Sequence, residues 1–231
     1  MIKIYNRNEI TVDEILERSE QTIDVEGIVA DIIKNIRENG DKALVEYSKK
    51  FDGALDDVIE VSADEIEAAF NEVDDELIEI LKQAKENITE FHSRQVRNSF
   101  LINEKDGVII GQKVLPIEKV GLYVPGGTAA YPSSVLMNCV PAKIAGCSEI
   151  VMVTPAKAGK VKPVILAAAK IAGVDRVFKI GGAQAIAALA YGTESVPKVD
   201  KIVGPGNAFV AEAKKQVFGM VDIDMIAGPS E

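Results

Sequence analysis

The sequence predicts an α/β fold in which a helical N-terminal arm precedes a mainly parallel sheet. In residues 118–231, short β-branched runs alternate with Ala-rich runs of helical length, which is the pattern of right-handed βαβ units. Three of the β-branched runs lead into Gly-rich turns, and such turns meet at the carboxyl edge of a parallel sheet, where ligands bind. Residues 1–98 instead carry apolar residues at helical spacing.

The N-terminal arm is predicted to consist of amphipathic helices. Capping boxes, in which Ser or Thr is followed three residues later by Glu, occur at residues 11–14 and 62–65. Gly40 stands where a C-terminal cap would, and Asp41 is expected to cap a following helix through Tyr47. These helices are expected to be packing surfaces, with a dimer contact as the alternative. The apolar stripes are Ile28, Ile32, Ile33 and Ile36, then Ile66, Ala69, Phe70 and Val73, then Leu77, Ile80, Leu81, Ala84, Ile88 and Phe91.

A β-hairpin is predicted between the arm and the sheet. Residues 99–103 and 108–115 are rich in β-prone side chains, and a Lys-Asp-Gly turn at 105–107 separates them. We therefore divide the chain into residues 1–118, a helical arm and incomplete first domain with the hairpin, and residues 119–231, a second domain that contains the sheet.

The second domain is predicted to contain five strands and four helices. A glycine follows each helical run at the position of a C-terminal cap. Pro141 falls inside the first helical run, so that helix is expected to be kinked or split. The expected strands are residues 119–124, 149–154, 176–180, 201–203 and 221–225, and the expected helices are residues 133–145, 160–172, 183–191 and 207–218.

Composition excludes several classes of protein. A formal net charge of −10 argues against a nucleic-acid partner, whose phosphates require a basic surface. The sequence has no apolar run of about 18 residues and no secretory signal at its start, so we expect no membrane contact. The two cysteines give no disulfide framework, and a cytoplasmic protein is the default expectation.

Histidine and cysteine chemistry is limited. His92 is the single histidine and cannot build a zinc site alone. Cys139 and Cys147 could each act as a nucleophile toward an aldehyde, but neither has a histidine neighbour in sequence, and a buried structural thiol is the alternative.

The Gly-rich turns are the candidate ligand contacts. Tyr123 begins the turn YVPGG, which reads either as a nucleotide or substrate lip or as an ordinary tight turn. Gln184, in GGAQ, either presents its amide to a nicotinamide or ribose or is a surface glutamine. Asn207 closes the turn GPGN, which does not complete the dinucleotide fingerprint GxGxxG because Phe209 holds the sixth position. Ser230, in GPSE, is a candidate hydrogen-bond partner for a substrate.

Four motifs carry a resemblance to histidinol dehydrogenase. They are GLYVPGG, PAKIAGC, GGAQAIAALAYGTESVPKVDKI with GPGNAFV, and IDM with AGPSE. The resemblance implies an NAD-dependent, zinc-requiring enzyme of histidine biosynthesis that oxidises L-histidinol to L-histidine through L-histidinaldehyde. It also implies a pair of incomplete Rossmann-like domains of aldehyde-dehydrogenase-like architecture, of which residues 119–231 form the NAD-binding second domain, in a homodimer with intertwined arms. It assigns NAD contacts to Tyr123, Gln184 and Asn207, and a substrate contact to Ser230.

The resemblance also implies which residues are absent from this sequence. In the family, the zinc ligands and the Glu-His pair that moves protons follow the GPSE motif. We therefore expect no metal ligand and no catalytic residue in this chain, and we expect the chain to be a truncated part that is inactive alone. The alternatives are a non-catalytic dimerising or nucleotide-binding fragment and a cysteine-dependent aldehyde dehydrogenase.

Overall fold

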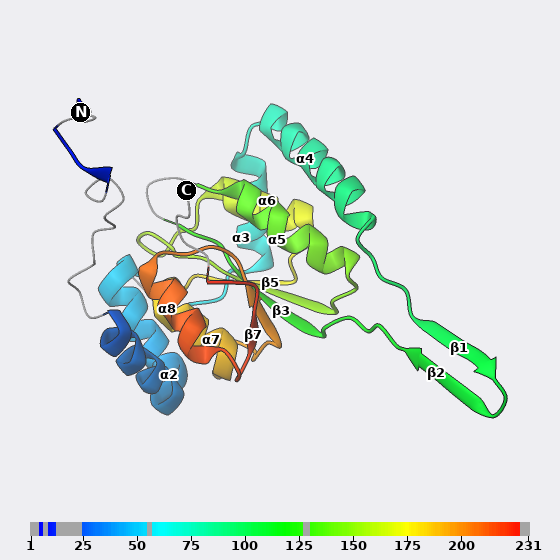
Figure 1. Cartoon of the computed structure of the whole chain (residues 1–231). Coiled ribbons are helices and arrows are strands. Elements are labelled where there is room, and N and C mark those ends of the chain that lie inside the picture. The colour runs from blue at the N-terminus through cyan, green and yellow to red at the C-terminus, as the bar shows by residue number, and fades with distance from the viewer. Residues whose placement is uncertain (1–4, 7–8, 13–24, 55–56, 127–129, 227–231) are drawn as a thin grey trace.

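The computed structural model contains a five-stranded parallel sheet in the order β5-β4-β3-β6-β7 (Figure 1). It describes residues 5–6, 9–12, 25–54, 57–126 and 130–226. The chain builds outward from β3 to β5, then crosses back so that β6 lies on the other side of β3. The strand order therefore reverses between β3 and β6. The strands are β3 (Lys119–Tyr123), β4 (Glu149–Val153), β5 (Arg176–Phe178), β6 (Lys201–Val203) and β7 (Asp222–Ile223).

Helices cover both faces of this sheet. On one face, α7 and α8 pack against each other and against α2, while on the other α5 and α6 pack with α4 and α3. The strands alternate accordingly, since Val151 and Val153 join the first core and Ile150 and Met152 join the second. The helices are α2 (Val25–Tyr47), α3 (Ala63–Glu72), α4 (Asp75–Ser93), α5 (Pro132–Ile144), α6 (Pro163–Ala172), α7 (Gly182–Tyr191) and α8 (Ala208–Val217).

The predicted α/β fold is confirmed, and each expected strand and helix of the second domain is present within a few residues of its expected ends. One helix, α5, continues through Pro141, so the expected splitting there was wrong. Because N-terminal helices contribute to both cores, the division at residue 118 stays a prediction about the organisation of the chain.

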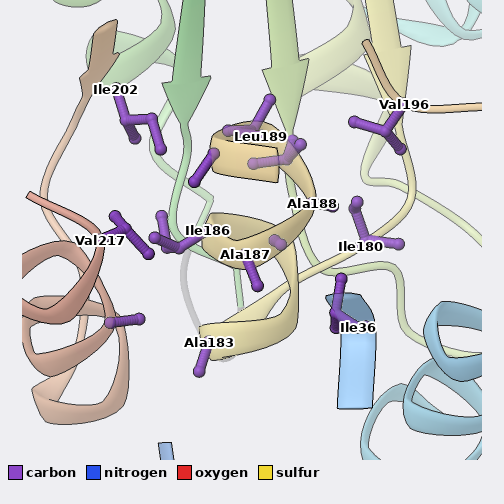
Figure 2. Packing of buried hydrophobic residues seen from close by; sticks show 14 of the residues in the cluster. Ile36, Ile180, Ala183, Ile186, Ala187, Ala188, Leu189, Val196, Ile202 and Val217 are labelled. Carbon is purple, nitrogen blue, oxygen red and sulfur yellow. The ribbon is translucent and has the colours of Figure 1, made fainter. Parts of the chain in front are cut away.

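The first core is centred on α7 (Figure 2). This helix is rich in alanine, and its residues 183–190 are all buried, so it can lie close to the sheet. Leu189 and Ile186 are fully buried in this core, and Ile36 reaches it from α2. Gly121 of β3 leaves room for the Leu189 side chain, because a Cβ at Gly121 would lie 2.8 Å from Leu189 Cδ1. A side chain in the middle of the sheet would therefore displace the helix.

The helical arm differs from expectation at Asp41. Gly40 interrupts α2 with a φ of 51°, as the predicted helix end at this position requires. The carboxylate of Asp41 does not cap the following helix but accepts hydrogen bonds from the hydroxyls of Thr193 and Ser195, each at 2.5 Å. Glu194 in turn accepts the Asp41 N–H at 2.8 Å. These hydrogen bonds between Asp41 and residues 193–195 hold α2 against the loop after α7.

The capping prediction for α3 is confirmed, since Ser62 Oγ accepts the Glu65 N–H at 3.1 Å. The other predicted box includes Asp13 and Glu14, which lie outside the described residues. In the described part of the chain, no helix combines the length and the apolar character needed to cross a bilayer.

The predicted hairpin is present and projects from the body of the molecule (Figure 1). Its strands β1 (Phe100–Lys105) and β2 (Val108–Gln112) pair antiparallel, and every residue of both is exposed. Apolar side chains are among them, including Leu101, at 79% exposure, and Ile109, at 74%.

Candidate functional site

The Gly-rich turns meet at one edge of the sheet, beside the point where the strand order reverses. They follow β3, β5 and β6, which are parallel, so all three lie at carboxyl ends. Gly126 and Gly181 both pack on the ring of Pro155, and Gly204 packs on the carbonyl of Tyr123. In open α/β sheets, this reversal creates the crevice in which ligands bind. We call these three turns the shelf.

Tyr123 ends β3 at the centre of the shelf. It is buried, and its hydroxyl oxygen accepts the N–H of Gly182 at 3.2 Å, which joins the first turn to the second. Burial, with a smaller contribution from the charge of Asp52, raises the pKa of Tyr123 to about 12. The phenol is therefore neutral at physiological pH and keeps its own O–H as a donor.

Gln184 lies in the first turn of α7 and is only 2% exposed. The reading as a surface glutamine was therefore wrong. Its side-chain oxygen lies over Gly182, where an added Cβ would approach it to 2.7 Å. Gln184 and Tyr123 are both buried and both approach the same glycine, Gly182, at the start of α7.

Asn207 caps a helix in the third turn. It is exposed and is the N-cap of α8, where its Oδ1 accepts the Val210 N–H at 3.1 Å. This bond uses the oxygen of the amide and leaves the Nδ2 donors outside the cap. Ser230, the predicted substrate contact, lies outside the described residues.

A cavity of about 630 Å³ opens next to the first turn. The sequence did not predict this cavity. One of its walls is a π-helix, η1 (Ser48–Asp52), which follows α2, and no local sequence pattern indicated a π-helix there. Single-turn π-helices often mark functional sites. The cavity also has a basic rim in a chain whose net charge is −10. Its lysines are Lys50, Lys157, Lys160 and Lys162, and Pro125, Gly126 and Pro155 connect it to the shelf.

Asp52 is the acidic residue of this cavity. Its Oδ2 is buried and has no hydrogen-bond partner among the described residues. Burial raises the pKa of Asp52 to about 6. Its backbone carbonyl accepts the Ala158 N–H at 3.0 Å, which ties η1 to the loop after β4. The backbone contact between η1 and this loop thus fixes the position of Asp52, for which no ion pair occurs among the described residues.

The raised pKa of Asp52 predicts a pH dependence of stability. A carboxyl whose pKa rises on folding stabilises the protein fully below its unfolded value, near 4, and this contribution is lost as the pH passes about 6. Asp52→Asn cannot ionise, so it should not lose this stability as the pH rises. Its free energy of unfolding at pH 7 should be about 1 kcal/mol higher, a value discounted for partial exposure of the side chain. Urea titrations of both proteins between pH 4 and pH 7 test this. Parallel pH profiles would contradict it.

The two cysteines and the histidine lie apart from the shelf. Cys139 is buried in the second core, and burial raises its pKa to about 11. Cys147 precedes the amino end of β4, at the opposite edge of the sheet, and burial raises its pKa as well. Neither is an activated thiolate, so the geometry argues against the cysteine-dependent alternative.

The described residues do not fit a zinc site. His92 ends α4, where its Nδ1 lies 2.6 Å from Gln95 Oε1. Within the described ranges, no three His, Cys, Asp or Glu side chains gather as metal ligands would. The expectation that no metal ligand occurs in this chain therefore stays a prediction for the residues that are not described.

A parallel sheet with helices on both faces and Gly-rich turns at its reversal point defines the class of doubly wound α/β proteins. Within this class, a family model described as histidinol dehydrogenase matches residues 16–231. The chain belongs to the histidinol dehydrogenase family.

Individual relatives agree with this assignment. The histidinol dehydrogenase of Clostridium acetobutylicum is 62% identical over 87% of this chain and 47% of its own length. That of Listeria innocua is 55% identical over 97% of this chain and 52% of its own length. The crystal structure of histidinol dehydrogenase from Elizabethkingia anophelis superposes with a TM-score of 0.87 at 43% identity, over 92% of this chain and 50% of that one. The chain thus spans about half the length of the relatives it matches.

Proposed function

We propose that this chain provides the cofactor-binding part of an NAD-dependent histidinol dehydrogenase, which oxidises L-histidinol to L-histidine through L-histidinaldehyde. The observation that carries the proposal is the convergence of Tyr123 and Gln184 on Gly182 at the carboxyl edge of the sheet. Bound NAD would supply the hydride acceptor. The residues of this chain would bind and orient it.

Each contact has a separate role in this proposal. Tyr123 offers a neutral O–H in a dry setting, and Gln184 offers an amide, which is the complement of a carboxamide or a ribose. Asn207 offers the Nδ2 donors that its cap leaves over. The basic rim of the neighbouring cavity suits the phosphates of a dinucleotide. Ser230 would contact histidinol. The zinc of the family has no place among the described residues, so no step is assigned to it.

The exposed hairpin supports a homodimer. Monomeric proteins rarely expose contiguous apolar surfaces of this kind, and a second copy would cover the apolar side chains of β1 and β2. We propose a cytoplasmic homodimer, and light scattering of the purified chain tests the dimer.

The cofactor contacts are tested by NAD titration in a calorimeter. Asn207→Ser keeps a capping oxygen but removes the amide, and Gln184→Met keeps the volume but removes the polar group. Each should weaken NAD binding about tenfold, the value of one hydrogen bond to a ligand, without unfolding the protein. Asn87→Ser on the exposed face of α4 is the matched control and should bind as the unmodified chain does.

Two results would contradict the proposal. Unchanged affinity in both Asn207→Ser and Gln184→Met would refute the shelf as the cofactor face. NADH formation from histidinol by this chain alone would show that it carries its own catalytic residues, and would overturn its assignment as the binding part only.

A further inference from the structure

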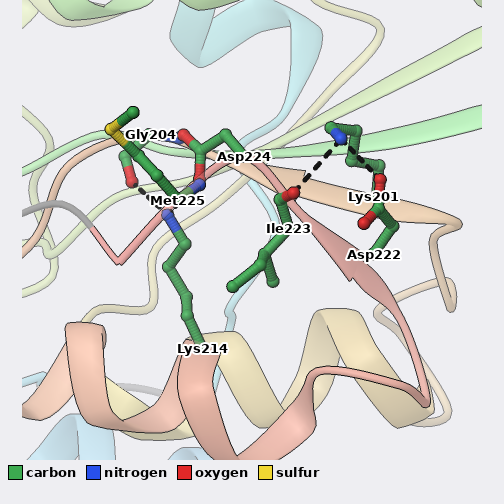
Figure 3. A network of polar contacts seen from close by, with 7 residues as sticks. All are labelled: Lys201, Gly204, Lys214, Asp222, Ile223, Asp224 and Met225. Atoms are coloured by element: carbon green, nitrogen blue, oxygen red, sulfur yellow. Dashed lines mark hydrogen bonds and ion pairs between the residues drawn. The ribbon is translucent and has the colours of Figure 1, made fainter.

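An ion pair between a buried lysine and a partly exposed aspartate holds the third turn of the shelf (Figure 3). Lys214 rises from α8 with 1% of its side chain exposed, and its ammonium contacts the carboxylate of Asp224, which follows β7. The same ammonium donates to the carbonyl of Gly204 at 3.0 Å. Asp224 Oδ2 accepts the N–H of Gly204 at 2.8 Å. Both backbone polar groups of Gly204 are therefore occupied by one charged pair.

Gly204 is the residue through which this pair reaches the rest of the shelf. Its φ of 116° lies in the left-handed range, and an added Cβ would lie 2.1 Å from the carbonyl oxygen of Tyr123. The turn that ends in Asn207 therefore begins at a residue pressed against the end of β3. Any displacement of Gly204 changes the spacing between Asn207 and Tyr123.

Stability alone does not explain a charged pair at this position. Removing the Lys214 ammonium from water costs several kcal/mol, and solvent weakens its attraction to the partly exposed carboxylate of Asp224. The charged pair instead fixes the orientation of the Gly204 backbone, because the ammonium binds its carbonyl oxygen and the carboxylate binds its N–H. Asp224 also accepts the N–H of the next residue, Met225, at 2.6 Å.

We propose that Lys214 and Asp224 are positioning residues for the cofactor contacts of this site. They fix the turn that carries Asn207 against Tyr123, because they bind both backbone polar groups of Gly204. The inference rests on the proposed function and adds to it the pair of residues that holds the third turn in place.

The test replaces the pair without leaving a lone buried charge. In the double variant Lys214→Met with Asp224→Asn, both charges are removed and the side-chain shapes are kept. We expect it to remain folded and to bind NAD at least about tenfold more weakly, because a small misplacement of binding groups is costly. The Gly204 amide resonance should also shift in a ¹⁵N–¹H spectrum, whereas resonances of α4 should not.

The matched control uses a second ion pair, which joins the neighbouring strands β6 and β7. Lys201 and Asp222 join β6 to β7 at the other end, with 28% and 52% of their side chains exposed (Figure 3). Lys201→Met with Asp222→Asn should bind NAD as the unmodified chain does. Equal losses of affinity in the two double variants would overturn the inference, since they would report only the removal of a charged pair and not the position of that pair beside Gly204.

The remaining outcomes separate this inference from the proposed function. If the unmodified chain binds NAD and the Lys214/Asp224 double variant binds it equally well, the positioning role is refuted and the proposed function stands. If the unmodified chain does not bind NAD, the proposed function fails and the positioning role with it. Should the double variant fail to fold, Asp224→Glu, which keeps the charge but lengthens the side chain, replaces it. A folded Asp224→Glu variant with unchanged affinity would overturn the inference.

Discussion

Gly204→Ala is expected to lower the free energy of unfolding by about 4 kcal/mol, since a strained backbone and an overpacked contact each cost about 1–3 kcal/mol. Gly204 has a φ of 116°, which side chains rarely adopt. An added Cβ would also lie 2.1 Å from the backbone oxygen of Tyr123, which belongs to the central strand and has little room to move. Urea denaturation of the variant measures the loss.

Gly219→Ala separates the two contributions. Gly219 has a φ of 98°, but nothing lies within 4 Å of the position where its Cβ would be. The free energy of unfolding of Gly219→Ala should therefore fall only by the cost of backbone strain, about 1–2 kcal/mol. Equal losses in the two variants would show that the contact with Tyr123 does not restrain the turn.

Leu189→Ala is expected to lower the free energy of unfolding by about 3–4 kcal/mol. Leu189 is fully buried between α7 and β3, and truncation would leave a cavity in the middle of the first core. The loss includes the transfer of the side chain and the cavity that the surrounding helices fill only in part. Thermal and urea unfolding both measure it.

Gly121→Ala provides the partner for a double-mutant cycle. Alone, it overpacks the contact with Leu189 Cδ1 at 2.8 Å and should also destabilise the protein. Combined with Leu189→Ala, the added methyl group enters the space that the leucine leaves, so the double variant should lose less than the sum of the single losses. Additive losses would contradict the packing of α7 on β3 described here.

The order of strands and helices could be predicted because its signals are local. Alternation of β-branched and Ala-rich runs, a glycine after each helix, and a Ser-x-x-Glu box all act over a few residues. The Gly-rich turns could also be assigned to one edge, since parallel strands place their carboxyl ends together. The hairpin followed from its turn residues in the same way.

The remaining features depend on contacts between distant segments. Asp41 met Thr193 and Ser195 instead of capping its own helix, because the packing of α2 on α7 brings them together. The burial of Gln184 and the ion pair of Lys214 with Asp224 arise from tertiary packing, and no local pattern marks them. The π-helix that lines the cavity could also not be predicted from the sequence, since its residues continue a helical pattern.

The packing of α2 on α7 and α8 has a consequence for biosynthesis. The apolar face of α2, which includes Ile32, Ile36 and Leu44, is completed by helices that leave the ribosome much later. At common rates of translation, this face stays uncovered for about ten seconds or longer. Nascent chains that end before α7 should therefore recruit chaperones through α2, and chains that extend past α8 should release them.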